Sequence, residues 1–216
     1  MTDRRPLELF TDAFWISPYV FTTFVALTEK GLPFDAVVVP LQDGAQHAPS
    51  FRDTTLTARV PALRDGDFWL AESQAIVEYL DDAYPAGPRL QPADVKQRAR
   101  CRQILGWVRS DLGALREERP TSTMFYEHAK TPLSEAGRKA ADKLLRVAGQ
   151  LVPEGATSLF GAWSIADADL AFMLHRLILN GEDVPAKVRA FAEAQWARPS
   201  VQAFVTRSRP PYVPYG

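Results

Sequence analysis

Residues 60–80 have the sequence VPALRDGDFWLAESQAIVEYL, and this stretch decides the fold of the first part of the chain. Two short apolar runs, 60–63 and 68–70, flank the turn-forming residues 64–67, which predicts an antiparallel strand pair. Apolar residues at helical spacing follow Ser73 and predict a helix that begins there.

The residues before this stretch add a strand–helix–strand unit. Residues 7–11 and 34–41 are strand-like, and a helix is expected between them from Ser17-Pro18 to Gly31, since these residues favour helix starts and ends. Such a crossover implies parallel pairing. Residues 42–59 are polar and are expected to form a loop with a short helix. The order predicts an α/β domain with a small mixed sheet.

The rest of the chain has helical patterns only. Three prolines and a glycine crowd residues 85–93 and predict a linker. The sequence therefore predicts a first domain at 1–84 and an all-helical domain at 94–216. Helices are expected in this second part at residues 95–116, 133–152, 164–179, 185–196 and 200–207.

Composition excludes several classes of function. The 25 basic and 26 acidic residues give a net charge of -1, which argues against nucleic acid or a membrane surface as a partner. With Cys101 as the one cysteine and three histidines, no disulfide, CxxC pair or metal site is expected. No apolar run approaches the about 18 residues of a membrane span, and the start of the chain has no apolar leader. We expect a cytoplasmic, metal-free protein.

Two helix starts are candidate anion sites. At Glu72-Ser73 a strand ends and a helix begins, and a carboxylate is favoured at such a helix N-terminus. Ser17 lies at the other start and suits a hydrogen bond to an anionic sulfur of a ligand, because no histidine base lies in the first 46 residues. The alternative for both serines is a simple helix cap.

Pro61 at the start of a short strand predicts an edge position or a cis bond. A cis bond would turn the backbone N–H and C=O of Val60 toward an extended peptide ligand. The alternative is an ordinary proline at a strand start.

Four pieces of sequence together carry a resemblance to a known family. They are SPY at 17–19, RVP at 59–61, ESQAI at 72–76 and the capping box SIAD at 164–167. With them the chain resembles the cytosolic glutathione S-transferases, and among these the bacterial serine-type members, over residues 7 to about 205.

The resemblance implies a thioredoxin-like domain with a mixed four-stranded sheet, followed by a helical-bundle domain that forms the electrophile pocket. It implies glutathione as co-substrate, a small apolar electrophile or hydroperoxide as second substrate, and a homodimer. Ser17 would be the catalytic residue that hydrogen-bonds the glutathione sulfur. The activity expected is conjugation of glutathione to electrophiles, reduction of organic hydroperoxides, or both. The alternative is a non-catalytic glutathione-binding or scaffolding protein.

The resemblance also implies which residues bind glutathione. Val60 would bind the cysteinyl backbone, with Pro61 cis, and Glu72 and Ser73 would hold the γ-glutamyl group. Arg59 would lie at the glycyl end. His47 is a second candidate there because it belongs to the same polar loop, and its alternative role is that of a solvated loop residue. The sequence TLTA at 55–58 departs from the Asn-Pro-x-Gly that is usual in the family.

Four aromatic residues are candidates for the substrate pocket. Phe14 and Trp15 precede Ser17 in its loop, and Tyr19 follows it as a second candidate for stabilising the thiolate. Trp107 lies on the apolar face of the long helix expected at 95–116, where core packing is the alternative role.

The helical part carries further expectations about structure. Cys101 is expected to be an inert packing residue, and Asp167 a helix cap. Asp111 is expected to be a buried carboxylate that pairs with Arg100 or faces the ligand. The charged residues 116–120 are expected to form a solvated helix end.

Overall fold

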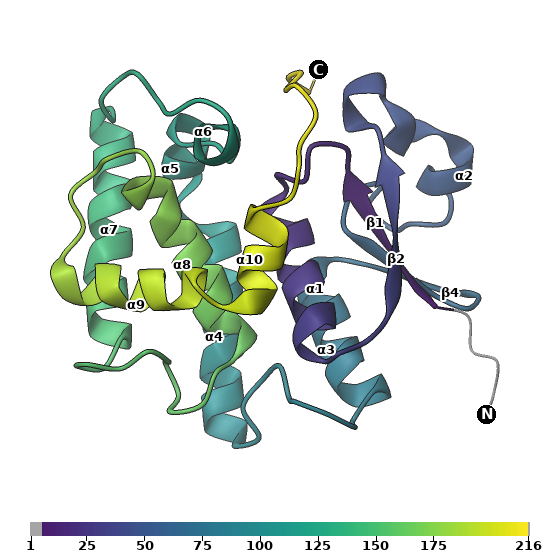
Figure 1. Ribbon diagram of the computed structural model, residues 1–216, viewed down its shortest axis with the longest axis horizontal. Coiled ribbons are helices and arrows are strands. Elements are labelled where there is room, and N and C mark those ends of the chain that lie inside the picture. The colour runs from purple at the N-terminus through teal and green to yellow at the C-terminus, as the bar shows by residue number, and fades with distance from the viewer. Residues whose placement is uncertain (1–5, 216) are drawn as a thin grey trace. The chain divides into compact units, whose positions relative to one another are not determined.

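The computed structural model describes residues 6–215, which form two compact units (Figure 1). The first unit comprises the residues up to 90 together with 206–215, and the second comprises residues 91–205. The sequence predicts residues 206–215 to be part of the helical domain, whereas their contacts place them with the first unit.

The first unit is built on one mixed sheet with the strand order β2-β1-β3-β4. Its elements are β1 (Leu7–Asp12), α1 (Pro18–Glu29), β2 (Phe34–Val39), the 3-10 turns η1 (Leu41–Asp43) and η2 (Ala45–His47), α2 (Pro49–Arg52), β3 (Ala62–Asp65), β4 (Phe68–Ala71) and α3 (Ser73–Ala83). β1 pairs parallel with β2 and antiparallel with β3, and β3 pairs antiparallel with β4. The predicted mixed four-stranded sheet is confirmed.

Helices cover both faces of this sheet. In Figure 1, α1 and α3 lie on one face and α2 lies on the other. Phe10 of β1 packs on Phe51 of α2 and on Trp69 of β4, with ring centroids 5.7 and 4.6 Å apart. Leu9, the preceding residue, points to the opposite face, as the two-residue period of a strand requires, and is fully buried.

Helix α1 begins and ends where the sequence predicts. Ser17 is its N-cap and Pro18 its first residue, and the Ser17 hydroxyl accepts a hydrogen bond from the N–H of Val20 at 3.3 Å. Gly31 follows the C-cap with φ of 65°, a left-handed conformation that glycine adopts without strain. The sequence therefore fixes both ends of the helix that follows β1.

The second unit is built from helices, with one isolated β-bridge between Phe160 and Ala162 among its described residues. Its helices are α4 (Val95–Ser110), α5 (Gly113–Glu118), α6 (Ser122–Phe125), α7 (Glu135–Leu151), α8 (Ile165–Ile178), α9 (Ala186–Trp196) and α10 (Pro199–Val205). Helix α8 contacts α4, α6, α7 and α9, and all of its residues from Ile165 to Leu177 are buried. The helix expected at 164–179 is therefore present and is buried on every side, as befits a segment that is apolar almost all round.

The long helix expected at 95–116 is in fact broken, and the prediction of one continuous helix is wrong. Leu112 has φ of 62°, a left-handed conformation that interrupts the helix, so that α4 ends at Ser110 and α5 begins at Gly113. Asp111 at this break is half-exposed and binds the indole N–H of Trp107, the backbone N–H of Leu112 and the ammonium of Lys143. It is therefore not a buried partner of Arg100.

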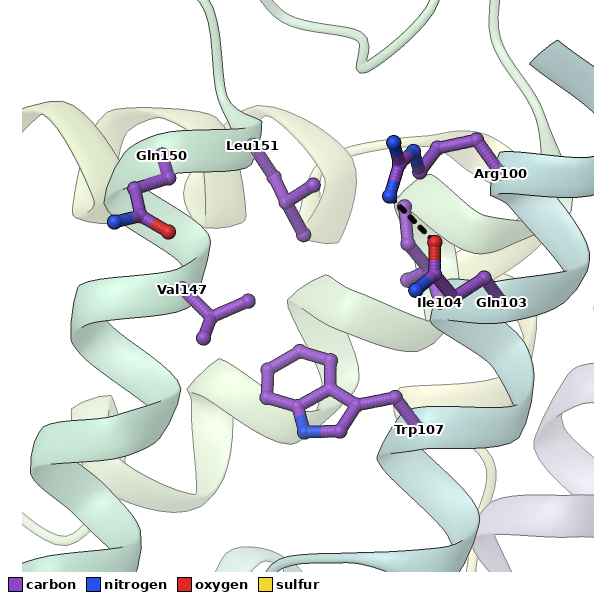
Figure 2. Close-up of a pocket in the computed structure, with 7 residues that line it drawn as sticks. All are labelled: Arg100, Gln103, Ile104, Trp107, Val147, Gln150 and Leu151. Atoms are coloured by element: carbon purple, nitrogen blue, oxygen red, sulfur yellow. Dashed lines mark hydrogen bonds between the residues drawn. The ribbon is translucent and has the colours of Figure 1, made fainter. Parts of the chain in front are cut away.

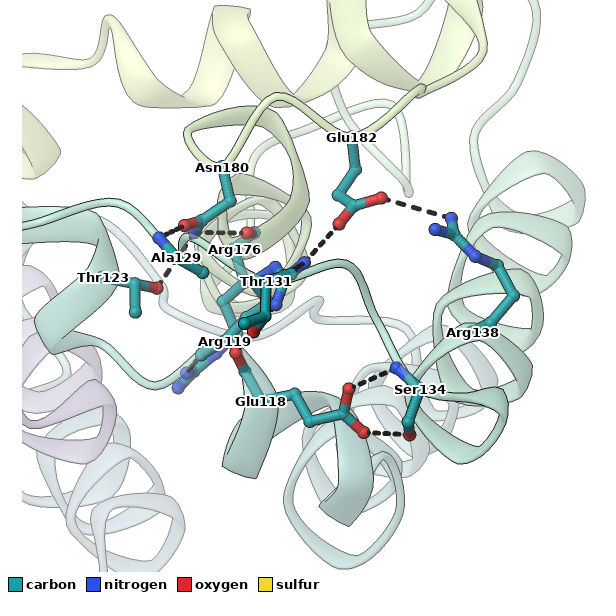
Figure 3. A network of polar contacts seen from close by, with 10 residues as sticks. All are labelled: Glu118, Arg119, Thr123, Ala129, Thr131, Ser134, Arg138, Arg176, Asn180 and Glu182. Carbon is teal, nitrogen blue, oxygen red and sulfur yellow. Dashed lines mark hydrogen bonds and ion pairs between the residues drawn. The ribbon is translucent and has the colours of Figure 1, made fainter.

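The charged residues 116–120 also differ from their prediction as a solvated helix end. Arg119 is only 3% exposed and donates to the carbonyl of Thr131 at 3.0 Å and to the carboxylate of Glu182 at 2.6 Å (Figure 3). Arg176 donates in turn to the carbonyl of Arg119 at 2.6 Å. This network ties the end of α5 to α8 and to the loop before α7.

Asp167 and Cys101 behave as the sequence predicts. Asp167 completes a capping box at the start of α8, accepting from the N–H and hydroxyl of Ser164 and from the N–H of Leu159. Burial raises the pKa of the Cys101 thiol to about 12, so this side chain is a packing group.

Among residues 6–215 no helix has both the length and the apolarity to cross a membrane.

Candidate functional site

The loop between β1 and α1, residues 13–17, is held by a buried carboxylate. Asp12 ends β1 and is fully buried, and its two oxygens accept the N–H of Ile16 at 2.9 Å and the N–H of Ser17 at 3.2 Å. Trp15 within this loop has φ of 53°, which is uncommon for a residue with a side chain. The loop therefore presents Ser17 in a fixed position at the start of α1.

The Ser17 hydroxyl has a free proton to donate. Its oxygen accepts the hydrogen bond from Val20, and among residues 6–215 the hydroxyl donates to no acceptor. The side chain is half-buried at the N-terminus of a 12-residue helix, where the helix dipole favours negative charge. An anionic atom placed beside Ser17 would receive this hydrogen bond.

The peptide bond between Val60 and Pro61 is cis, which confirms that prediction. Val60 precedes β3, and its backbone N–H and C=O lie outside the sheet ladder and pair with no described residue. Val60 thus retains both groups that an extended peptide would use.

Glu72 and Ser73 lie at the junction of β4 and α3. Glu72 has φ of 69° and ψ of 108°, a strained conformation for glutamate, and its side chain is exposed. It does not cap α3, although it occupies the N-cap position. Ser73 begins the helix and is 3% exposed. Strain at an exposed acidic residue beside a helix N-terminus is a feature typical of ligand sites.

Arg59 and His47 lie on different loops of the first unit. His47 ends η2, is exposed, and its ring lies 3.3 Å from the side-chain amide of Gln46. Arg59 is exposed in the segment that follows α2 and precedes Val60. Both side chains present positive or polar groups to solvent.

Phe14 and Trp15 are almost fully buried, at 3% and 7% exposed. Phe14 packs on the rings of Tyr212 and Tyr215, whereas Trp15 packs on Phe24. Both side chains contribute to the interior of the first unit. Tyr19, on the first turn of α1, is half-buried.

Trp107 lines a cavity within the helical unit. The cavity has a volume of about 300 Å³ and lies between α4 and α7 (Figure 2). Its lining residues are Arg100, Gln103, Ile104, Trp107, Val147, Gln150 and Leu151. The indole N–H of Trp107 donates to Asp111 at 3.1 Å, which fixes the ring at the edge of this space.

The sequence did not predict the residues that hold the loop carrying Ser17. Asp12 is the last residue of β1, and an acidic residue at a strand end gives no periodic signal of its role. Arg207 and Arg209 contact Trp15 in the loop, and Tyr215 contacts Asp12, from about 190 to 200 residues further along the chain. No pattern of local spacing can reveal such contacts.

Two family models of known proteins match the sequence of this chain. The glutathione S-transferase N-terminal domain matches residues 16–83, and the glutathione S-transferase C-terminal domain matches residues 94–209. The chain therefore belongs to the glutathione S-transferase family.

Individual relatives support this assignment. The chain is 41% identical to a glutathione transferase homolog from Burkholderia gl BGR1, a structure with bound glutathione, with a TM-score of 0.78 over 93% of this chain and 97% of that one. It is 37% identical over 106 residues to glutathione S-transferase theta-3 of Mus musculus, covering 49% of this chain and 43% of that protein. It is 38% identical over 99 residues to glutathione S-transferase Z2 of Arabidopsis thaliana, covering 46% and 44%. These two matches span less than half the length of each relative.

Proposed function

We propose that this protein is a glutathione transferase in which the hydroxyl of Ser17 stabilises the thiolate of bound glutathione. One observation carries the proposal: Ser17 is fixed through its N–H by Asp12, yet its hydroxyl proton is uncommitted among the described residues. A hydroxyl with these properties at a helix N-terminus suits an anionic sulfur.

The energies are sufficient for this role. A free thiol has a pKa of about 8.5, and each unit by which that pKa falls corresponds to about 1.4 kcal/mol. A hydrogen bond to a charged acceptor contributes about 1.5–3 kcal/mol. The α1 dipole adds about 0.3–1 kcal/mol. Ser17 therefore suffices to lower the thiol pKa by one to about two units without acting as a base.

The geometry of the first unit supports the remaining contacts that we propose for glutathione. The unpaired backbone groups of Val60 suit the cysteinyl residue. The exposed carboxylate of Glu72 and the α3 N-terminus at Ser73 suit the ammonium and carboxylate of the γ-glutamyl group. Arg59, with His47 as a second candidate, would bind the glycyl carboxylate.

The second substrate is proposed to be a small apolar electrophile or an organic hydroperoxide. Phe14, Trp15, Tyr19 and Trp107 remain the candidates for its pocket. Because Phe14 and Trp15 are buried, we propose that they pack beneath the residues that contact the second substrate. We also propose a homodimer that acts in the cytoplasm, in line with the family resemblance.

The decisive experiment compares the wild-type protein with Ser17→Ala. Glutathione is titrated into each protein and the ultraviolet absorbance of the thiolate is followed against pH. We expect the pKa of bound glutathione to rise by one to about two units in Ser17→Ala, and the turnover of an aryl chloride to fall about tenfold or more. Ser134→Ala is the matched control, because Ser134 caps α7 in the same way and lies in the helical unit.

Each result has a definite meaning. Absence of glutathione binding by the wild-type protein would overturn the proposal. Binding without a lowered thiol pKa would favour a glutathione-binding scaffold. Equal thiol pKa values in the wild type and Ser17→Ala would transfer the role to Tyr19 or to backbone donors. A parallel assay with cumene hydroperoxide separates conjugation from peroxide reduction.

A further inference from the structure

The segment 206–215 contacts the loop that carries Ser17. It belongs to the first unit, and Figure 1 shows it (yellow) running beside the loop that follows β1. Its side chains contact Asp12, which precedes the loop, and Trp15, which lies within it. None of these contacts involves Ser17 itself, so any effect on Ser17 must pass through the loop.

Two arginines of the segment fix Trp15. Arg209 donates from Nε and Nη2 to the carbonyl oxygen of Trp15, at 3.3 and 3.1 Å. The guanidinium of Arg207 stacks on the Trp15 ring, 3.9 Å from its centroid, and lies 5.5 Å from the ring of Phe24. The backbone and the side chain of Trp15 are therefore each held by a separate cation.

Trp15 is the residue of the loop that most needs such restraint. Its φ of 53° is one that residues with a side chain avoid unless surrounding contacts impose it. A hydrogen-bonded fork on its carbonyl oxygen fixes the orientation of the following peptide plane, which leads into Ile16 and Ser17.

Tyr215 acts on the other support of the loop. Its hydroxyl donates to Oδ2 of Asp12 at 3.0 Å, and the same oxygen accepts the N–H of Ile16 at 2.9 Å. The other oxygen of Asp12 accepts the N–H of Ser17. The ring of Tyr215 also packs on Phe14, with centroids 5.7 Å apart. The tyrosine hydroxyl thus helps to set the rotamer of the carboxylate that holds Ser17.

We propose that Arg207, Arg209 and Tyr215 are positioning residues for Ser17, and that segment 206–215 clamps the loop 13–17 in the conformation that aims the Ser17 hydroxyl at the glutathione sulfur. This inference rests on the proposed function. The three side chains touch neither glutathione nor the second substrate in this proposal. They act through Trp15, Asp12 and Phe14.

The proposal predicts a specific kinetic signature. The contacts proposed for glutathione lie at Val60, Glu72 and Ser73, outside the clamped loop, so glutathione affinity should change little. The hydrogen bond from Ser17 to the sulfur should weaken, because it depends on the position of the loop. Loss of one clamping contact should therefore lower the thiolate fraction and kcat while the KM for glutathione stays nearly constant.

The test uses Arg209→Ala and Tyr215→Phe, and the latter removes only the hydroxyl group. Val213→Ala is the matched control, because Val213 lies between the clamping residues and is 52% exposed. In each protein we would measure the pKa of bound glutathione by thiolate absorbance, and kcat and KM for glutathione with an aryl chloride. Hydrogen exchange of the amides of Ile16 and Ser17 would report on the loop in the absence of glutathione.

We expect Tyr215→Phe, which loses one hydrogen bond, to lower kcat by about fivefold, and Arg209→Ala, which loses two, to lower it by about fivefold or more. In both variants the KM for glutathione should stay within about twofold of wild type. The thiol pKa should rise in parallel, the two amides should exchange faster, and Val213→Ala should behave as wild type. Unchanged thiol pKa and kcat in both variants would overturn the positioning role while leaving the role of Ser17 intact. If the wild type itself failed to lower the thiol pKa, the proposed function and this inference would fall together. A raised KM with wild-type kcat would also overturn the inference, because it would place the segment in glutathione binding.

Discussion

The backbone N–H of Ser17 donates to the carboxylate of Asp12 at 3.2 Å, and this hydrogen bond joins the end of the first strand to the start of the first helix. The same carboxylate accepts the N–H of Ile16, so one buried side chain satisfies two backbone donors of the loop. Asp12 is fully buried, and water cannot replace these bonds. The conformation at Ser17 therefore depends on a residue five positions earlier in the chain.

Replacement of Asp12 by asparagine should destabilise the protein. The asparagine amide keeps one acceptor, but its NH₂ group would face a backbone N–H and leave a buried donor unsatisfied. We expect Asp12→Asn to lower the free energy of unfolding by about 1–3 kcal/mol, measured by urea denaturation. Asp53→Asn is the control, since that exposed carboxylate pairs with Arg52 at the surface and its replacement should change stability by less than about 0.5 kcal/mol. Equal effects of the two substitutions would contradict a special role for Asp12.

The sequence predicted those parts of the fold that local chemistry determines. The two-residue and 3.6-residue periods located the four strands and most helices, and Ser17, Pro18 and Gly31 marked the ends of α1. The capping box at Asp167 was also predicted from a single motif, and the cis bond before Pro61 from the family resemblance. In each case the deciding residues are close together in sequence.

Most features that were missed depend on contacts between distant residues. The break after α4 falls at Leu112, which adopts a left-handed conformation that is uncommon for a residue with a side chain. The adjacent Gly113 is a local signal of this break, and the prediction of one continuous helix overlooked it. Arg119 is buried because Glu182, 63 positions later, pairs with it. The contacts of Arg209 with Trp15 span 194 positions. A pattern that covers one or two helical turns contains no information about such partners.

Asp167 should contribute more to stability than a cap at the surface. Its carboxylate accepts from two backbone N–H groups and one hydroxyl in a fully buried site. We expect Asp167→Ala to lower the free energy of unfolding by about 2 kcal/mol or more, because buried donors lose their partner. Asp94→Ala provides the comparison, since Asp94 caps α4 at an exposed position and its loss should cost about 1 kcal/mol. A loss in Asp167→Ala no greater than in Asp94→Ala would show that burial adds nothing to this cap.

Cys101 should be unreactive in the folded protein. Burial raises the pKa of its thiol to about 12, and the thiolate is the reactive form. A disulfide reagent added at neutral pH should therefore label none of the native protein, and one equivalent after unfolding in guanidinium. Because Cys101 is the one cysteine of the chain, no other thiol contributes to the signal. Labelling of the native protein at the rate of free glutathione would contradict the packing role.

His175 should make the protein sensitive to acid. The ring is 2% exposed, stacks on Trp196 with centroids 3.8 Å apart, and has Nδ1 at 2.8 Å from the carbonyl oxygen of Ala171. Burial, together with the nearby charge of Arg189, lowers the pKa of His175 from 6.5 to about 4. The unfolded chain therefore binds a proton at this residue at a higher pH than the folded chain does.

The sign of the effect follows from this difference. Between pH of about 6.5 and about 4 the unfolded state gains the proton first, so the free energy of unfolding should fall as the pH falls, by up to about 3 kcal/mol from this residue. Urea denaturation of the wild type and of His175→Phe across this range isolates the contribution, since all other groups titrate alike in both proteins. Phenylalanine keeps an aromatic ring against Trp196 but cannot titrate, so the stability of this variant should depend less on pH. Parallel stability curves for the two proteins would mean that His175 is protonated in the folded state as readily as in the unfolded chain.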